Sequence, residues 1–163
     1  MRALVISGGG SKGAFAGGVA QYLMEVRGTQ YDLLLGTSTG SLLIPHLALG
    51  KINKIYDIYT NVNKDNIFNV SPFVIKQKGG VDIVTINHFN VIKQFLQGKR
   101  TFGESRRLLK YVKNNFSIAE FNQLKASNVN IVVTVTNITL NRVEYKCIRD
   151  YDYEDFCEWV WIS

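Results

Sequence analysis

Two glycine-rich turns near the start of the chain contain the residue types of acyl-transfer chemistry. They read Gly8-Gly9-Gly10-Ser11-Lys12-Gly13 and Gly36-Thr37-Ser38-Thr39-Gly40. The second matches G-x-S-x-G, in which the flanking glycines allow a sharp turn that exposes the serine hydroxyl at the start of a helix. Backbone amides in the first turn and at that helix start could stabilise an oxyanion. In a plainer interpretation, Ser38 only caps the helix.

Segment 8–13 also fits two nucleotide-binding patterns, though less well. A P-loop requires Lys and then Ser or Thr after its last glycine, where this chain has Ala14 and Phe15. The dinucleotide pattern G-x-G-x-x-G fits the glycines, but its acidic residue should end the second strand. Asp32 instead precedes the apolar run of that strand. A nucleotide-binding module that uses these glycines is therefore a distant alternative.

Strands and helices must alternate around the two turns to position them. Residues 2–7 and 31–36 are short apolar runs typical of buried strands, and helices are expected over residues 14–27 and 38–50. One stripe of the first helix is apolar: Phe15, Val19, Tyr22, Leu23 and Val26. Adjacent parallel strands would bring both turns to the same edge of a sheet.

The rest of the chain gives weaker signals. Residues 51–116 are expected to be mostly helical or irregular. Ser117 and Glu120 have the spacing of a capping box at the start of a short helix over residues 117–126. Residues 129–139 and 141–148 alternate and are rich in β-branched side chains, which predicts a hairpin. Together these elements predict an α/β fold with a mainly parallel sheet.

Length and composition predict a single globular domain over residues 1–163. Nineteen Lys and Arg against thirteen Asp and Glu give a net charge of +6, which favours anionic partners. Cys147 and Cys157 have no metal-ligand spacing, so we expect no metal site. Two cysteines cannot form a disulfide framework, which indicates a reducing compartment. We expect no other cofactor. No apolar run reaches the roughly 18 residues of a membrane span. The N-terminal run is too short for a signal peptide, which favours a cytoplasmic protein, peripheral at membranes if it contacts them.

The two turns and their surroundings resemble the patatin-like phospholipases, a family of lipid acyl hydrolases. The resemblance rests on GGGSKG (residues 8–13), GTSTG (residues 36–40) and the strand-like runs before them, and it is specific over about residues 1–50. It implies a three-layer α/β/α fold and a phospholipase A-type activity on lipid or phospholipid esters. It also implies that Ser38 is the nucleophile and that amides around Gly9, Gly10 and Ser11 hold the oxyanion.

The family pairs its serine with an aspartate in a D-G-G or D-G-A turn, and this sequence contains neither. Asp82 follows two glycines instead of preceding them, and Asp150, Asp152 and Asp155 lack the following glycine. We therefore expect a domain that stops before its catalytic aspartate and has little or no activity. A catalytically inactive lipid-binding or scaffold domain is the main alternative.

Neither histidine is a good substitute for the aspartate. His46 lies eight residues after Ser38 in the same expected helix, which places it roughly 12 Å away along the axis. His88 is the alternative base, since a Ser–His pair is a common arrangement, but it stands among residues with the pattern of an amphipathic helix, where a surface or capping role is favoured.

A basic segment, residues 99–113, could be the contact with an anionic membrane surface. It carries six Lys and Arg beside an apolar stripe of Leu108, Leu109 and Val112, continued by Phe116. The favoured interpretation is a solvated helix face over a core stripe, and an interfacial helix is the alternative. No nucleic-acid recognition motif accompanies the charge, so nucleic acid is not an expected partner. The sequence leaves the oligomeric state open.

Overall fold

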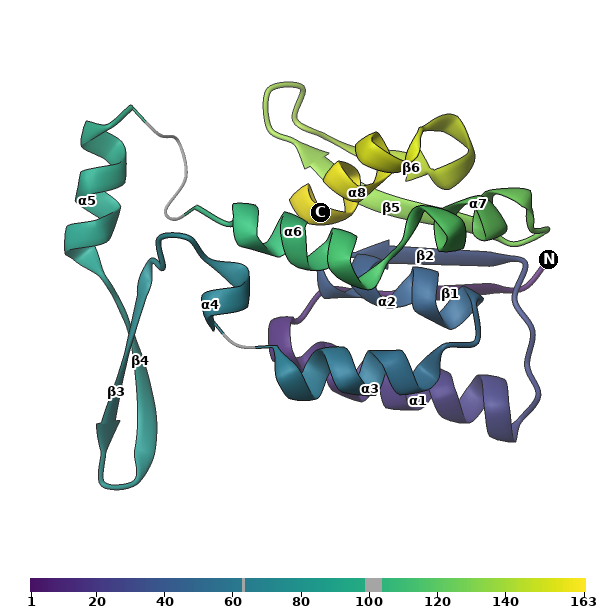
Figure 1. Cartoon of the computed structure of the whole chain (residues 1–163), viewed down its shortest axis with the longest axis horizontal. Coiled ribbons are helices and arrows are strands. Elements are labelled where there is room, and N and C mark those ends of the chain that lie inside the picture. Colours follow the sequence, from purple (N-terminus) through teal and green to yellow (C-terminus); the bar gives the residue numbers. More distant parts are fainter. Residues whose placement is uncertain (63, 99–103) are drawn as a thin grey trace. The chain divides into compact units, whose positions relative to one another are not determined.

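The chain forms two units in a computed structural model that describes residues 1–62, 64–98 and 104–163 (Figure 1). The first unit consists of Met1–Asn61 and Val112–Ser163, and the second is Val62–Tyr111. The first unit contains both glycine-rich turns.

A four-stranded sheet is the centre of the first unit. Its strands follow the order β1-β2-β5-β6 and span Ala3–Ile6 (β1), Leu33–Thr37 (β2), Asn130–Asn137 (β5) and Arg142–Cys147 (β6). The first three are parallel, and β6 is antiparallel to β5. The predicted α/β fold with a mainly parallel sheet is therefore confirmed, as is the predicted hairpin.

Helices flank this sheet (Figure 1). In the first unit they are α1 (Gly13–Gln21), α2 (Thr39–Ala48), α3 (Ile52–Asn61), α7 (Ile118–Ala126) and α8 (Tyr153–Ile162), while α6 (Arg106–Asn115) begins in the second unit. Helix α2 packs on β1, β2 and β5, and α1 and α3 both pack against α2. The start of α7 has the predicted capping box between Ser117 and Glu120.

Burial alternates along the strands because successive side chains point to opposite faces. The face toward α2 contains Leu34, Ile131 and Val133, all fully buried. Val5 and Tyr145 belong to the opposite face, where both are exposed. The core of the first unit therefore lies between one face of the sheet and its covering helices.

The apolar stripe expected on the first helix points away from the core. Phe15 is 79% exposed, and Val19 and Tyr22 are exposed as well. The face of α1 that is buried consists of Gly13, Gly17 and Ala20. Small residues allow a helix to approach its neighbours closely, so α1 packs through them instead of through its large side chains. A π-helical turn (Tyr22–Val26) continues α1 toward the expected end of the helix.

The second unit contains a hairpin that the sequence analysis missed. The elements of this unit are α4 (Lys64–Ile67), β3 (Phe73–Lys78), β4 (Val81–Ile86) and α5 (His88–Leu96). The antiparallel strands β3 and β4 form the hairpin. The expectation of a mostly helical or irregular middle was therefore wrong for this part. Gly79 and Gly80 form the turn, and both have positive φ, as a two-residue hairpin turn of type I′ requires.

Helix α6 carries the second half of the basic segment. Its Val112, together with Phe116 just beyond the helix, is buried, as a core stripe requires. Lys113 pairs with Glu154 of α8. Residues 99–103 of the basic segment lie outside the described residues. The described part thus agrees with the favoured interpretation of a helix that covers the core.

Candidate active site

Ser38 connects the end of β2 to the start of α2 in a strained conformation. Its φ is 55° and its ψ is −122°, and Asn141 is the only other non-glycine residue with positive φ among the described residues. Such a backbone costs about 1–3 kcal/mol and persists only where the surroundings impose it. Ser38 is exposed, and its hydroxyl does not cap α2. The simple capping interpretation therefore does not describe this turn.

The glycines on either side of Ser38 make the sharp turn possible. A Cβ on Gly36 would lie 2.5 Å from the carbonyl carbon of Gly40. A Cβ on Gly40 would lie 2.9 Å from the carbonyl carbon of Ile6 and closer still to its oxygen. The end of β1, the end of β2 and the start of α2 are thus in backbone contact.

The first glycine-rich turn lies directly beside Ser38. A Cβ on Gly8 would lie 2.6 Å from Ser38 Cβ and 3.2 Å from Ser38 Oγ. Gly9 is exposed, and a 3₁₀ turn (Gly10–Lys12) leads from it into α1. Because β1 and β2 are parallel neighbours, both turns emerge at the same edge of the sheet, as the sequence analysis expected.

The side chains of Ser163 and Ser41 form hydrogen bonds with the backbone of Ser38. The Ser38 N–H donates to Ser163 Oγ (2.9 Å), whose hydroxyl donates to the Thr134 carbonyl (2.7 Å). The buried Ser41 hydroxyl donates to the Ser38 carbonyl (2.5 Å). These positioning residues were missed in the sequence analysis. Only the position of Ser41, three residues after Ser38, was a local signal, since Ser163 and Thr134 are distant in sequence.

The sequence matches the family of patatin-like phospholipases over residues 4–163. The chain belongs to this family. The cUMP-AMP-activated phospholipase of Escherichia coli is 36% identical over 64 residues, which are 36% of this chain and 20% of that protein. The match therefore spans a fifth of the length of this relative. No solved structure matches the chain.

Within the first unit, Asp152 and Asp32 both lie away from Ser38. Asp152 caps the start of α8, accepting a hydrogen bond from the Asp155 N–H, whereas the opposite end of this helix reaches Ser38. Ten helical residues separate the two ends by about 15 Å. Asp82 lies in β4 of the second unit. Asp32 accepts a hydrogen bond from the Arg2 N–H at the amino ends of β1 and β2, which is the edge opposite to the glycines.

His46 is buried in the core, where it serves packing. Its ring meets the Phe116 ring edge-on, with 6.2 Å between the centroids. The pKa of His46 is lowered to about 4, and burial is the largest cause. The positive charge of Lys54 also lowers the pKa, by more than the negative charge of Glu120 raises it. His46 Nδ1 has no hydrogen-bond partner in the described part of the chain. His88 starts α5 in the second unit and is exposed.

Acidification should destabilise the protein through His46. The pKa of this residue is lower in the folded chain than its ordinary 6.5, so its contribution to stability is complete above pH 6.5. That contribution is lost as the pH falls from 6.5 to about 4, and it amounts to about 3 kcal/mol. Chemical unfolding across this range measures it.

The matched variant for this test is His46→Leu, which keeps an apolar side chain in the core. Its stability should change little between pH 6.5 and 4.5. Glu120, whose pKa is lowered to about 2, adds acid sensitivity only below its ordinary 4.5. Burial raises the pKa of Glu120, but hydrogen bonds from Lys51, Ser117 and Lys54 outweigh this. Equal pH profiles for both proteins above pH 4.5 would contradict the assignment.

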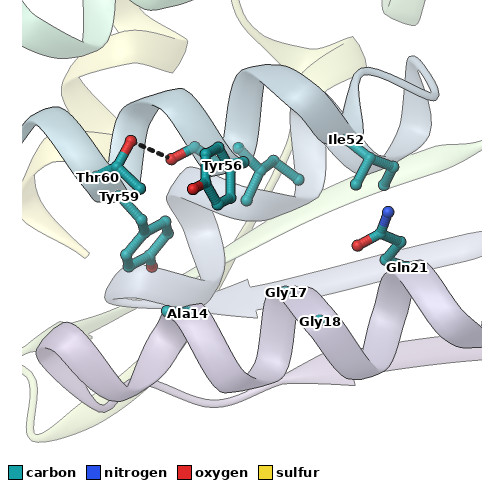
Figure 2. A pocket seen from close by; sticks show the side chains of 9 residues that line it. Ala14, Gly17, Gly18, Gln21, Ile52, Tyr56, Tyr59 and Thr60 are labelled. Carbon is teal, nitrogen blue, oxygen red and sulfur yellow. Dashed lines mark hydrogen bonds between the residues drawn. The ribbon is translucent and has the colours of Figure 1, made fainter.

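A groove lies between α1 and α3 (Figure 2). It has a volume of about 260 Å³ and is lined by Ala14, Gly17, Gly18, Gln21, Ile52, Ile55, Tyr56, Tyr59 and Thr60. At one end, the Tyr59 hydroxyl is buried against Gly13, next to Thr39. Burial raises the pKa of Tyr59. The lining is mostly apolar, so the groove can accept part of a hydrocarbon chain.

No metal site or membrane span accompanies these features in the part of the chain that the structure describes. His, Cys, Asp and Glu side chains form no group there that could hold a metal ion. None of the described helices has the length and apolar character needed to cross a bilayer.

Proposed function

We propose that this chain is a lipid acyl hydrolase domain of phospholipase A type in which Ser38 is the nucleophile. Family membership supports lipid ester hydrolysis in general. The observation that carries the finer proposal is the position of Ser38. It is a strained, exposed serine whose Oγ would lie 3.2 Å from a Cβ on Gly8.

In the proposed reaction, Ser38 Oγ attacks the ester carbonyl carbon, and the Ser38 proton passes to a base. The negative charge on the carbonyl oxygen is stabilised by amides of the loop at Gly9, Gly10 and Ser11, and by the amino end of α2. Collapse of this tetrahedral intermediate expels the alcohol and leaves an acyl ester on Ser38. Water then attacks that ester, releasing the fatty acid and restoring the hydroxyl.

The base that accepts the Ser38 proton is not identified by the motif of the family, in which an aspartate starts a D-G-G or D-G-A turn. No D-G-G or D-G-A turn occurs in residues 1–163. A serine hydroxyl without an adjacent base is a weak nucleophile at neutral pH. We therefore expect these 163 residues to hydrolyse phospholipid esters only about 10³–10⁴ times faster than water alone.

Labelling with a small fluorophosphonate tests the proposal, because the reagent reports a primed serine without requiring turnover. Because no base follows the pattern of the family, we expect slow labelling that reaches one label per chain at excess reagent, located at Ser38 by peptide mass spectrometry. The label should be absent from Ser38→Ala and from heat-unfolded protein. A label on another serine, or equal labelling after unfolding, would refute the role of Ser38. Rapid phospholipid hydrolysis that Ser38→Ala abolishes would refute the expected weakness.

The second candidate is a lipid-binding or scaffold domain without catalysis, which the missing D-G-G or D-G-A turn favours. It predicts lipid binding without any labelling of Ser38.

A further inference from the structure

The net charge of the chain is concentrated in the second unit. Residues 62–111 contain nine Lys and Arg against three Asp and Glu, which accounts for the whole +6 of the protein. The remaining residues contain ten of each sign. Among the basic residues of the second unit, Lys76, Lys78 and Lys93 are exposed. This unit therefore attracts anions, while the unit that contains Ser38 is neutral overall.

Helix α5 of this unit directs its apolar stripe to the outside. Phe89 is 76% exposed, Ile92 58% and Leu96 84%, and the spacing of these residues places them on one side of the helix. Gln94 is only 2% exposed, and its Oε1 has no hydrogen-bond partner among the described residues. An amphipathic helix that faces water shows the reverse arrangement. The exposed apolar stripe of α5 is therefore typical of a surface that binds a partner.

The β3–β4 hairpin repeats this pattern. Phe73 pairs with Ile86, and Ile75 pairs with Val84, so these four exposed side chains share one face. Lys76 and Lys78 lie on the other face, where they pair with the exposed Ile83 and Val81. Large apolar side chains and lysines are therefore interleaved along a short hairpin.

We propose that the second unit docks on an anionic lipid surface, with α5 and the β3–β4 hairpin inserting apolar side chains between the headgroups. Lysines beside exposed apolar residues suit this partner, because phospholipid headgroups supply negative charge and the acyl boundary receives apolar groups. A second copy of the chain would bring two +6 units together. Nucleic acid would leave the apolar side chains in water. The proposal does not depend on catalysis by Ser38.

Vesicle co-sedimentation with the full chain tests this docking, using ether-linked lipids that an esterase cannot hydrolyse. The protein should sediment with phosphatidylcholine vesicles that contain phosphatidylglycerol, and not with pure phosphatidylcholine. The double variant Phe89→Ala with Ile92→Ala should bind at least about tenfold more weakly. Lys76→Gln and Lys78→Gln should each weaken binding about fivefold, and added salt should weaken it further.

The matched control is Phe15→Ala with Val19→Ala, which removes the same kind of exposed residues from helix α1 of the first unit. It should bind like the unchanged protein, and thermal unfolding should show that both double variants are folded. Equal losses in both would overturn the proposal, as would binding that needs no phosphatidylglycerol. Self-association that Phe89→Ala abolishes, or RNA binding stronger than vesicle binding, would also overturn it.

Discussion

Replacing Gly8 with alanine should slow fluorophosphonate labelling of Ser38 by about a hundredfold. The new Cβ would lie 2.6 Å from Ser38 Cβ and 3.2 Å from Ser38 Oγ, so either the serine or the glycine loop must move. A displacement of about 1 Å at a reacting group is enough for an effect of this size. The first strand and its loop would then no longer present amides to the oxyanion that forms on the reagent.

The measurement is the rate of label incorporation at fixed reagent concentration. Gly18→Ala is the matched control, because a Cβ there meets nothing within 4 Å. Its labelling rate should equal that of the unchanged chain, because the small reagent has no acyl chain to place in the groove that Gly18 lines. Since Gly8 does not have positive φ, alanine can adopt its backbone conformation, and Gly8→Ala should remain folded. A folded Gly8→Ala that labels at the normal rate would show that the two turns do not act together.

The two glycine-rich turns could be predicted from the sequence because their signals are local. An apolar run, a glycine cluster and a following helix pattern occupy adjacent residues, and parallel pairing of β1 with β2 then brings both turns to one edge. The supports of Ser38 have no such signal. Ser163 is 125 residues away in sequence, and only the folded chain places its hydroxyl on the Ser38 N–H.

The β3–β4 hairpin of the second unit was missed for a different reason. Segment 73–86 contains alternating β-branched residues on both sides of Gly79-Gly80, which is a recognised hairpin signal. The sequence analysis did not separate this signal from the helical or irregular pattern expected over residues 51–116. Likewise, periodicity predicted α1 but not its buried side. Small residues pack against the neighbouring helices there, and the large apolar residues remain outside.

Gly40→Ala should destabilise the protein by about 3 kcal/mol, the largest stability effect expected for a single added methyl group here. The new Cβ would overlap the carbonyl group of Ile6, whose carbon would be 2.9 Å away and whose oxygen would be nearer. The backbone of a strand that is paired in a sheet cannot rotate aside as a side chain can. Either β1 shifts out of register with β2, or α2 moves away from the sheet that it covers.

Chemical unfolding of Gly40→Ala against Gly18→Ala isolates this contact, because both substitutions add a methyl group within a helix. Alanine is a better helix former than glycine, so Gly18→Ala should raise the free energy of unfolding by about 0.5–1 kcal/mol. Gly40→Ala has the same propensity gain, and the clash must exceed it. The two variants should therefore change stability in opposite directions. If both variants are stabilised, α2 does not lie against the end of β1. The arrangement of β1, β2 and α2 that positions Ser38 would then be wrong.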